Sequence, residues 1–345
     1  MTQAVKAKAR ELGFERVGIA AAQSPPHADA FLRWLNGGDH GGMDYLRRTA
    51  EKRTDIQKVL PGAKSVVCVA MNYFTKDVFA QVRRAGDGRT VGKGDRHHRS
   101  GASPLFRPVP ISEAVPLTGR VARYAWGDDY HEVMGERVGK LADYLRGGLA
   151  GIEDRVDAVW YVDTGPVLER DFAAQAGVGW IGKNTCLIHP EQGSYLFLGE
   201  VITTLALEAD GPMSDHCGTC TLCLRACPTG ALTAPYRLDA QKCISYLTIE
   251  HRGAIDETMQ PAMGEWVYGC DICQEVCPWN AGARPTTERR FESREGMERP
   301  DLDAWGRMTE AEYRQKFKGS AMKRAKYEGS MRNVKIARKN AKRGR

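Results

Sequence analysis

The chain is organised around the stretch Cys217-Gly-Thr-Cys220-Thr-Leu-Cys223-Leu-Arg-Ala-Cys227-Pro228. Three cysteines are separated by two residues each, a fourth follows after three more, and a proline comes next. A second run, Cys270-Asp-Ile-Cys273-Gln-Glu-Val-Cys277-Pro278, lacks one cysteine of this pattern. Cys243 lies between the two runs, so this segment holds eight of the ten cysteines of the chain.

The spacing C-x2-C-x2-C-x3-C-P is the iron–sulfur pattern of bacterial ferredoxins, in which the fourth cysteine binds the other of two clusters. Cys243 supplies the ligand that the second run lacks. We therefore predict two 4Fe–4S clusters, each bound by four cysteines. The first cluster takes Cys217, Cys220, Cys223 and Cys277, and the second takes Cys227, Cys243, Cys270 and Cys273.

Zinc and disulfide bonds are the alternatives for these cysteines. Zinc sites favour two C-x2-C pairs, and they need neither the third cysteine nor the two Cys-Pro endings. Disulfide bonds need an oxidising compartment. The two remaining cysteines, Cys68 and Cys186, lie in apolar, strand-like contexts, so we expect them to be packed thiols rather than ligands or nucleophiles.

The length and composition indicate a protein with a sizeable core. A chain of 345 residues with a hydrophobic fraction of 42% is expected to form two or three domains. It has no apolar run of 18 residues, so we predict no membrane span. The N-terminus is typical of an amphipathic helix rather than a signal peptide, and reduced thiols with iron–sulfur clusters favour the cytoplasm.

Hydrophobic periodicity predicts three domains. Strands and helices alternate over residues 1–205, which favours an α/β (α+β) domain with an apolar, buried strand at 65–71. In this domain we expect a strand at 120–126 and a helix from Pro166 to about residue 176. A ferredoxin-like two-cluster domain follows at 206–285. Residues 286–345 form a polar and basic C-terminal segment, with one helical stretch from Met308 to about Ala337.

Two basic regions account for the net charge of +7. Residues 319–345 contain five lysines and five arginines against one glutamate, and residues 83–107 are rich in Gly, His and Arg. Such runs are typical of solvated faces or tails, but two of them also favour a polyanionic partner. Residues 177–182 match G-x-G-x-x-G, but they follow a predicted helix and precede a strand, the reverse of a dinucleotide loop.

Several further motifs, taken together, resemble the epoxyqueuosine reductase family. All of them precede the cysteine segment. They are Glu51-Lys-Arg53, Arg123-Tyr-Ala-Trp-Gly-Asp-Asp-Tyr-His131, Val162-Asp163-Thr-Gly165, Ala176 to Asn184 and Gly193-Ser-Tyr195. Together with the cysteine segment, the resemblance covers most of residues 1–285. The resemblance implies a cobalamin-dependent enzyme with two 4Fe–4S clusters. Such an enzyme reduces epoxyqueuosine to queuosine at the wobble position of tRNA anticodons, with cluster-fed cobalamin attacking the epoxide.

The resemblance also implies site residues. Asp163 matches the proton donor of the family, and we expect burial beside the corrin to raise the pKa of this carboxyl. The alternative is that Asp163 caps a helix that begins at Pro166. Cobalamin contacts are implied for Arg53, Ala122, Asp163, Leu187, Leu198 and Ser245. Asp129 and His131 fit helix capping as well as a site role, and they remain unassigned.

The expected partners are the tRNA anticodon loop and an external electron donor, with the chain acting as a monomer. RNA phosphates attract Lys and Arg, and the candidates are residues 83–107 with Arg314, Lys316, Lys318, Lys323, Arg324 and Lys326. Longer family members continue into helical repeats that this sequence does not contain. Two other functions stay open: a reductive dehalogenase-like enzyme acting on a small molecule, and a ferredoxin-type electron carrier.

Overall fold

The computed structural model describes residues 1–75, 116–147 and 156–343. Contacts divide the chain into two units, and the described residues apart from Pro116 belong to the unit formed by Met1–Thr75 and Leu117–Arg345. The predicted basic region at 83–107 lies outside the described residues. Among the described helices, none is long and apolar enough to cross a membrane.

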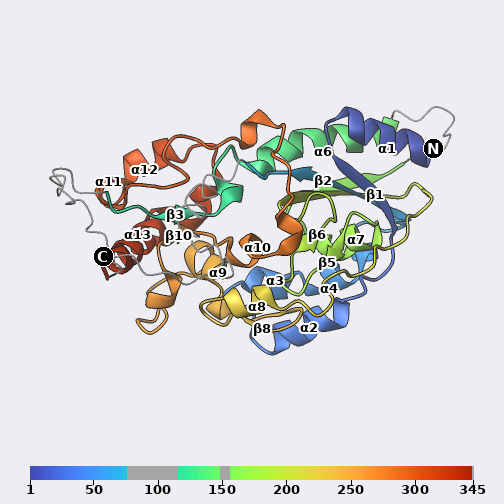
Figure 1. Ribbon diagram of the computed structural model, residues 1–345. Coiled ribbons are helices and arrows are strands. Elements are labelled where there is room, and N and C mark those ends of the chain that lie inside the picture. The colour runs from blue at the N-terminus through green and yellow to red at the C-terminus, as the bar shows by residue number, and fades with distance from the viewer. Residues whose placement is uncertain (76–115, 148–155, 344–345) are drawn as a thin grey trace, which may run out of the picture. The chain divides into compact units, whose positions relative to one another are not determined.

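A four-stranded sheet forms the centre of the first half of the chain (Figure 1). Its order is β1-β2-β7-β4, from β1 (Arg16–Ala21), β2 (Ser65–Asn72), β7 (Leu196–Thr203) and β4 (Ala158–Tyr161). All three pairings are antiparallel. The mixed α/β class is therefore confirmed. The sheet is antiparallel, whereas an apolar, buried strand is typical of the parallel sheets of α/β proteins.

Helices cover both faces of the sheet. The β2 side chains Val67 and Val69 share a core with α1 (Thr2–Glu11) and α6 (Tyr130–Gly147). The alternate β2 residues Val66 and Ala70 pack with α7 (Glu169–Gln175) on the other face. Because successive side chains of a strand point to opposite faces, a central strand covered on both sides is apolar throughout, whichever way its neighbours run.

Two predicted elements differ from the structure. The strand expected at 120–126 is limited to β3 (Arg120–Val121), and a 3-10 turn (Arg123–Ala125) follows it. The helix expected after Pro166 begins at Glu169, and its N-cap residue is Leu168. The intervening residues form a loop that leads from the end of β4 to α7. The remaining helices of this half are α2 (Ala28–Asn36), α3 (Asp44–Arg48) and α4 (Ala50–Thr54).

The cysteine-rich segment consists of short elements. They are α8 (Leu222–Ala226), β8 (Leu232–Ala234), β9 (Arg237–Leu238), α9 (Ile244–Ile249), β10 (Trp266–Tyr268) and α10 (Ile272–Glu275). A hairpin of β5 (Trp180–Ile181) and β6 (Leu187–Ile188) precedes them. β10 pairs in parallel with β3, so the cysteine segment continues the structure of the preceding half.

The C-terminal part contains α11 (Leu302–Trp305), α12 (Glu310–Lys316) and α13 (Lys326–Arg343). The single helical stretch expected from Met308 to about Ala337 is therefore interrupted. Gly319 and Lys326 both have positive φ angles, 64° and 59°, which an α-helix cannot contain. A 3-10 segment (Ala321–Ala325) lies between them.

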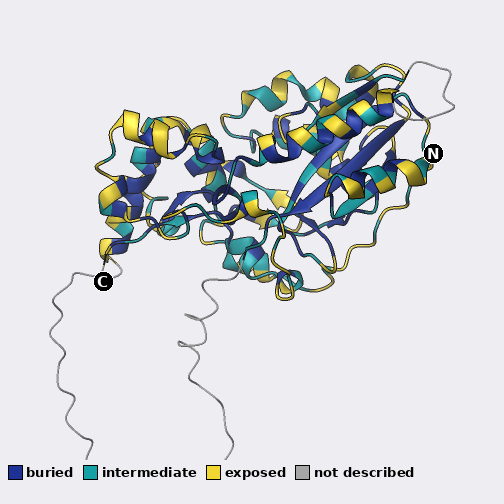
Figure 2. Ribbon diagram, turned by 90° about the horizontal axis from the view of Figure 1, so that it is seen from above, coloured by how far each residue is buried: buried dark blue, intermediate teal, exposed yellow. Residues whose placement is uncertain are grey.

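A buried polar joint connects the cysteine segment to the turn before β7. The side chain of Asn280 accepts a hydrogen bond from the Ser194 amide at 2.7 Å and donates to the Ser194 hydroxyl at 2.9 Å. It also donates to the Gln274 carbonyl at 2.7 Å, and the Gln274 amide donates to the Ser194 carbonyl at 3.0 Å. A Cβ on Gly193 would lie 1.9 Å from Oδ1 of Asn280, so only glycine fits there. Figure 2 shows the two central strands of the sheet, β2 and β7, as mostly buried.

Candidate functional site

Asp163 lies in the loop between β4 and α7. Its φ angle is 60°, in the left-handed region that non-glycine residues rarely adopt. Its side chain is 54% exposed. The N-cap of α7 is Leu168, so the alternative that Asp163 caps this helix does not apply. Strained backbone at an accessible carboxylate is a feature that clusters at functional sites.

His131, in the first turn of α6, connects Asp163 to a second carboxylate. Its Nε2 lies 3.4 Å from Oδ2 of Asp163, and its Nδ1 lies 2.7 Å from Oδ1 of Asp129. Asp129 is 1% exposed and accepts a hydrogen bond from the His131 amide at 3.2 Å. Lys323 forms an ion pair with its other oxygen at 2.8 Å. Asp129 therefore caps the helix and also orients the imidazole.

The groups around Asp163 shift its pKa in the direction opposite to the expected one. Burial by itself raises that pKa, but the hydrogen bond and the positive charge of His131 outweigh it, so the pKa is lowered. Burial lowers the pKa of His131, yet hydrogen bonds to Asp129 and Asp163 raise it to about 9. The expectation of a raised Asp163 pKa is wrong for this structure because a cationic imidazole adjoins the carboxylate. At neutral pH the shared proton belongs to His131.

Two more carboxyl groups and one guanidinium lie near Asp163. Burial and the negative charge of Asp163 raise the pKa of Glu169 to about 7, and burial raises that of Glu200 well above its usual value. Arg53 is 8% exposed and donates to the Val167 carbonyl at 2.9 Å and to the Thr49 hydroxyl at 3.0 Å. Its positive charge acts on both glutamates, so Arg53 belongs to the charged surroundings of Asp163.

The residues expected to contact cobalamin fall into two groups. Leu187 and Leu198 belong to the core between the sheet and α7, on the same side as Arg53 and Asp163. Ala122 belongs to another core, which it shares with Ile244, Cys243 and Tyr246 of the segment that also carries Ser245. Tyr124 packs against this second core and against the core beneath α6. The structure thus gives two apolar cores, which we call the two-part apolar wall, and Arg53 lies beside the first of them with Asp163, Glu169 and Glu200.

The glycine-rich turn before α3 passes close to α9. The amide of Gly42 donates to the hydroxyl of Tyr246 at 2.6 Å, and a Cβ on Gly41 would lie 2.6 Å from the same oxygen. Glycines permit such a close approach because they have no Cβ, and Tyr246 is the group approached. This contact brings α3, which carries Tyr45, towards the segment that carries Ser245.

The cysteines that affect one another's pKa can be compared with the two predicted sets. Burial raises the pKa of Cys277, and the charges of Cys217 and Cys223 raise it further; Cys223 is affected in the same way by Cys217 and Cys220. In the second set, Cys270 is raised by burial and by Cys243 and Cys227. Cys273 is raised by Cys270 and Cys243, besides the larger effects of Cys186 and burial. These mutual effects are consistent with the two predicted sets, which stay a prediction.

The two remaining cysteines differ from each other. Cys68 is buried in β2 with α7 against it, as expected for a packed thiol. Cys186 is half-buried and lies within hydrogen-bonding reach of Cys273. Over the described ranges, no three His, Cys, Asp or Glu side chains converge on a single point that could hold one metal ion. A 4Fe–4S cube presents four separate iron atoms, so its thiolates need not converge in this way.

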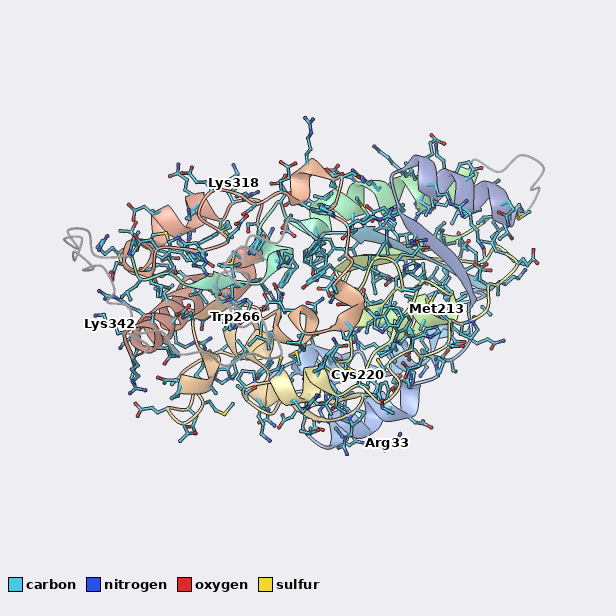
Figure 3. All side chains as sticks on the ribbon, in the orientation of Figure 1. Arg33, Met213, Cys220, Trp266, Lys318 and Lys342 are labelled. Atoms are coloured by element: carbon cyan, nitrogen blue, oxygen red, sulfur yellow. The ribbon has the colours of Figure 1, made fainter. Side chains whose placement is uncertain are left out.

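Most basic residues proposed to contact RNA have partners within the chain. Arg324 pairs with Glu250 at 2.8 and 2.9 Å, and Lys323 pairs with Asp129. Arg314 pairs with Glu310, and Lys316 lies 5.8 Å from the ring centroid of Trp305. Figure 3 shows Lys318 and Lys342 on the part of the chain that contains α11 to α13, and Cys220 beside α8.

The sequence analysis left two functional candidates unassigned, His131 and Asp129, and did not consider Glu169 or Glu200. The Asp-Tyr-His motif carried a signal, but a helix start explains it equally well. Only the fold shows that the imidazole reaches a carboxylate 32 positions further along the chain. The glutamates had no signal, because Glu200 lies singly in an apolar strand and Glu169 lies in an ordinary charged helix start.

Two family models match the chain. Residues 216–280 match a 4Fe-4S double cluster binding domain, and residues 105–164 match a family described as Epoxyqueuosine reductase QueG, DUF1730. The epoxyqueuosine reductase of Pseudomonas aeruginosa is 38% identical over 99% of this chain and 86% of its own length. That of Leadbetterella byssophila is 38% identical over 96% of both chains, and that of Escherichia coli is 35% identical over 99% of this chain and 81% of its own.

Solved structures give the same result. A crystal structure of epoxyqueuosine reductase with an epoxyqueuosine-modified tyrosine tRNA stem loop superposes with a TM-score of 0.81 and 30% identity, covering 99% of this chain and 81% of the other. A Bacillus subtilis epoxyqueuosine reductase, whose catalytic aspartate loop is swung out of the active site, has a TM-score of 0.80 and 29% identity over the same shares.

Proposed function

The chain belongs to the epoxyqueuosine reductase family, and on this premise we propose how its residues carry out that reaction. It is an oxidoreductase that reduces epoxyqueuosine. The observation that carries this function is the near full-length similarity to named reductases, joined to a cysteine segment of the double 4Fe-4S type. The proposed division of labour follows the predicted boundaries: 1–205 for cobalamin and catalysis, 206–285 for the clusters, and 286–345 as a basic helical segment.

The proposed substrate is a tRNA whose anticodon carries epoxyqueuosine at the wobble position. A related reductase has been crystallised with such a stem loop. Reducing an epoxide to an alkene consumes two electrons and two protons, and it releases the oxygen as water. An external donor supplies the electrons. A cytoplasmic location and a monomeric state remain predictions.

We assign the electron path to the two cysteine sets. Cys217, Cys220, Cys223 and Cys277 would hold one 4Fe–4S cluster, and Cys227, Cys243, Cys270 and Cys273 the other. The electrostatic grouping of the thiols supports these sets. Lys183 donates to the carbonyl oxygens of Gly218 and Cys220 and so fixes the first loop.

Cobalamin would lie against the two-part apolar wall near Asp163. The residues proposed to hold it are Arg53, Ala122, Asp163, Leu187, Leu198 and Ser245, and an apolar wall with few charged groups suits a large cofactor. When bound and reduced, cobalamin supplies a strong nucleophile for an epoxide carbon. The second cysteine set adjoins this wall through Cys243, which shares the core of Ala122.

The protein itself manages the protons. Asp163 faces the accessible side of the site, and His131 holds a proton 3.4 Å away. An opening epoxide leaves an alkoxide, which a positioned acid stabilises by protonating it. The proton starts on His131, and Asp163 is proposed to take it from the imidazole and pass it to the alkoxide. In the B. subtilis relative the catalytic aspartate loop is found swung out of the active site, and the exposed, left-handed Asp163 loop is suited to such movement.

Conversion of tRNA tests this function. Anaerobic protein with reconstituted clusters, cobalamin and a chemical reductant should convert epoxyqueuosine in tRNA to queuosine, detected by nucleoside digestion and mass spectrometry. Omitting cobalamin should abolish turnover while the cluster absorption remains. Undiminished turnover without cobalamin would contradict the proposed cofactor, and no conversion with all components present would contradict the function.

A further inference from the structure

A cavity of about 420 Å³ lies outside the proposed reaction site. It is formed by the loop after α9, the end of the 3-10 segment (Ala321–Ala325) and the first turns of α13. The side chains that give it its chemistry are His251, Arg252, Lys326, Glu328 and Arg332. Three permanent cations therefore face one carboxylate.

The two arginines are held in place by uncharged partners. Arg252 donates to the carbonyl oxygens of Ile249 at 3.0 Å and Arg324 at 3.0 Å. Arg332 donates to those of Leu247 at 2.7 Å and Gly253 at 2.7 Å. These bonds fix α13 to the loop after α9, but carbonyl oxygens leave the positive charges uncompensated.

The cationic groups of the cavity also affect one another. Burial lowers the pKa of Arg332, and the charge of the neighbouring Arg252 lowers it further. Within the described residues, no ion pair forms between a carboxylate and Arg252, Lys326 or Arg332. Neighbouring guanidinium groups repel each other, and the charge of a bound anion would offset that repulsion. The N–H groups of Arg332 all have partners in the chain, so Arg332 would act on the anion through its charge, and Lys326 would supply the direct contact.

Lys326 differs from the two arginines, because its ammonium group forms no hydrogen bond or ion pair among the described residues. It is exposed, and its φ angle of 59° is unfavourable for a lysine. Its neighbours in sequence differ, because Lys323 and Arg324 form ion pairs with Asp129 and Glu250. A strained backbone that presents a free ammonium group to a cationic cavity is consistent with selection for a ligand rather than for stability.

A chain of contacts connects the cavity with the surroundings of Asp163. The backbone of Arg324 accepts a hydrogen bond from Arg252, while the guanidinium of Arg324 lies 5.8 Å over the ring of Tyr45. The charge of Asp163 in turn acts on Tyr45, after burial and Glu250. Arg324 and Tyr45 therefore link the cavity to the residues around Asp163.

We propose that the cavity lined by Arg252, Lys326 and Arg332 binds a phosphodiester group of the tRNA anticodon stem loop while the modified base reaches Asp163. This proposal rests on the proposed function. Single-stranded loops present splayed bases to a pocket and phosphates to basic side chains, so a phosphate site beside the base site holds the nucleotide in register. The same chemistry is present in the phosphate of the cobalamin nucleotide tail, which the test must separate.

The test compares Lys326→Asn with Lys335→Asn in the full chain with its clusters. The φ and ψ angles of Lys326, 59° and 169°, are unfavourable for every residue except glycine, so asparagine leaves the strain as it is and the first variant should melt close to the wild type. Lys335 is exposed and lies nine positions further along α13, about two and a half turns, on the opposite side of the helix. Arg252 and Arg332 are not substituted, because their loss would detach α13.

Binding of a fluorescent tyrosine tRNA anticodon stem loop is measured over a range of salt concentrations. Lys326→Asn should weaken binding roughly fivefold to tenfold at about 0.1 M salt and reduce the slope of log K against log salt by about one. Lys335→Asn should match the wild type. Equal affinities for all three proteins, or equal losses for both variants, would overturn the proposal.

Cobalamin titration, followed by visible absorption, separates the two phosphate sources. Unchanged cobalamin affinity in Lys326→Asn, with weaker RNA binding, supports the RNA assignment. Weaker cobalamin binding with unchanged RNA binding would assign the cavity to the cofactor and overturn the proposal. Wild-type conversion of epoxyqueuosine is recorded in parallel, so that a failed phosphate site is distinguished from a failed function.

Discussion

The Nε2 atom of His131 lies 3.4 Å from Oδ2 of Asp163, while Nδ1 of the same ring lies 2.7 Å from the buried carboxylate of Asp129. The imidazole therefore bridges an inaccessible carboxylate and an accessible one. Two negative neighbours favour the imidazolium, so the ring stores a proton beside the residue that faces the substrate side. The first two predictions depend on this arrangement.

Replacing Asp163 by Asn should abolish most of the activity. The amide keeps the size of the side chain but cannot carry a proton to the oxygen, and positioned acids contribute about 100-fold to 10,000-fold. Single-turnover conversion of epoxyqueuosine tRNA measures the loss. Asp143→Asn is the control, because Asp143 is exposed on α6 and, among the described residues, its ion pair is with the neighbouring Arg146. Turnover of Asp163→Asn equal to that of the control would remove Asp163 from its role.

Replacing His131 by Asn should make the stability less dependent on pH. The folded-state pKa of His131 is raised from 6.5 to about 9, so its contribution is fully present below pH 6.5 and is lost as the pH rises through 9. The melting temperature of the variant should therefore fall furthest below the wild type at pH 6, and the difference should shrink towards pH 9.5. A difference that does not change with pH would contradict the ionic pair.

Replacing Cys243 by Ala should remove one cluster. A chain with two 4Fe–4S clusters binds about eight iron atoms, and loss of one ligand set should reduce this to about four or fewer. Iron and sulfide analysis of anaerobic protein gives the count. Cys68→Ala should retain the full content, since Cys68 is buried in β2 away from both sets. Full iron content in Cys243→Ala would show that the sets are wrongly assigned.

Replacing Asn280 by Ala should destabilise the chain by about 2–4 kcal/mol, because several buried partners lose their hydrogen bonds at once. Denaturant unfolding under anaerobic conditions measures the change. Asn36→Ala is a suitable control, since Asn36 is exposed at the end of α2. A loss no larger than that of the control would mean that water replaces the joint without cost.

Sequence spacing was sufficient to predict a double-cluster domain, because each run of cysteines is local; the assignment of single cysteines to the two sets stays a prediction. The buried strand at Ser65–Asn72 and the helix at Tyr130–Gly147 were also predictable from apolar periodicity. The order of the strands in the sheet was not predictable from the sequence. β7 inserts between β2 and β4 from far along the chain, and no local pattern encodes that pairing or its antiparallel direction.

The properties of the site were also only partly predictable from the sequence. Asp163 was identified only through the family resemblance, because its local sequence fits a helix cap as well. The pKa of Asp163 was predicted in the wrong direction, since the imidazole that lowers it arrives from another helix. The break at Lys326 was missed because lysine has no sequence signal for a left-handed backbone, and the tertiary contacts of α13 impose it there.

The joint of Asn280, Ser194 and Gln274 has a consequence for how the protein responds to a substrate. A fully bonded, buried polar network is rigid, so Cys273, next to Gln274, and Cys277, between Gln274 and Asn280, are held in a constant position relative to the sheet. We therefore expect the proposed clusters to keep their distance from the sheet when a substrate binds. Any response of the protein to a bound RNA would then fall to the accessible loop that carries Asp163.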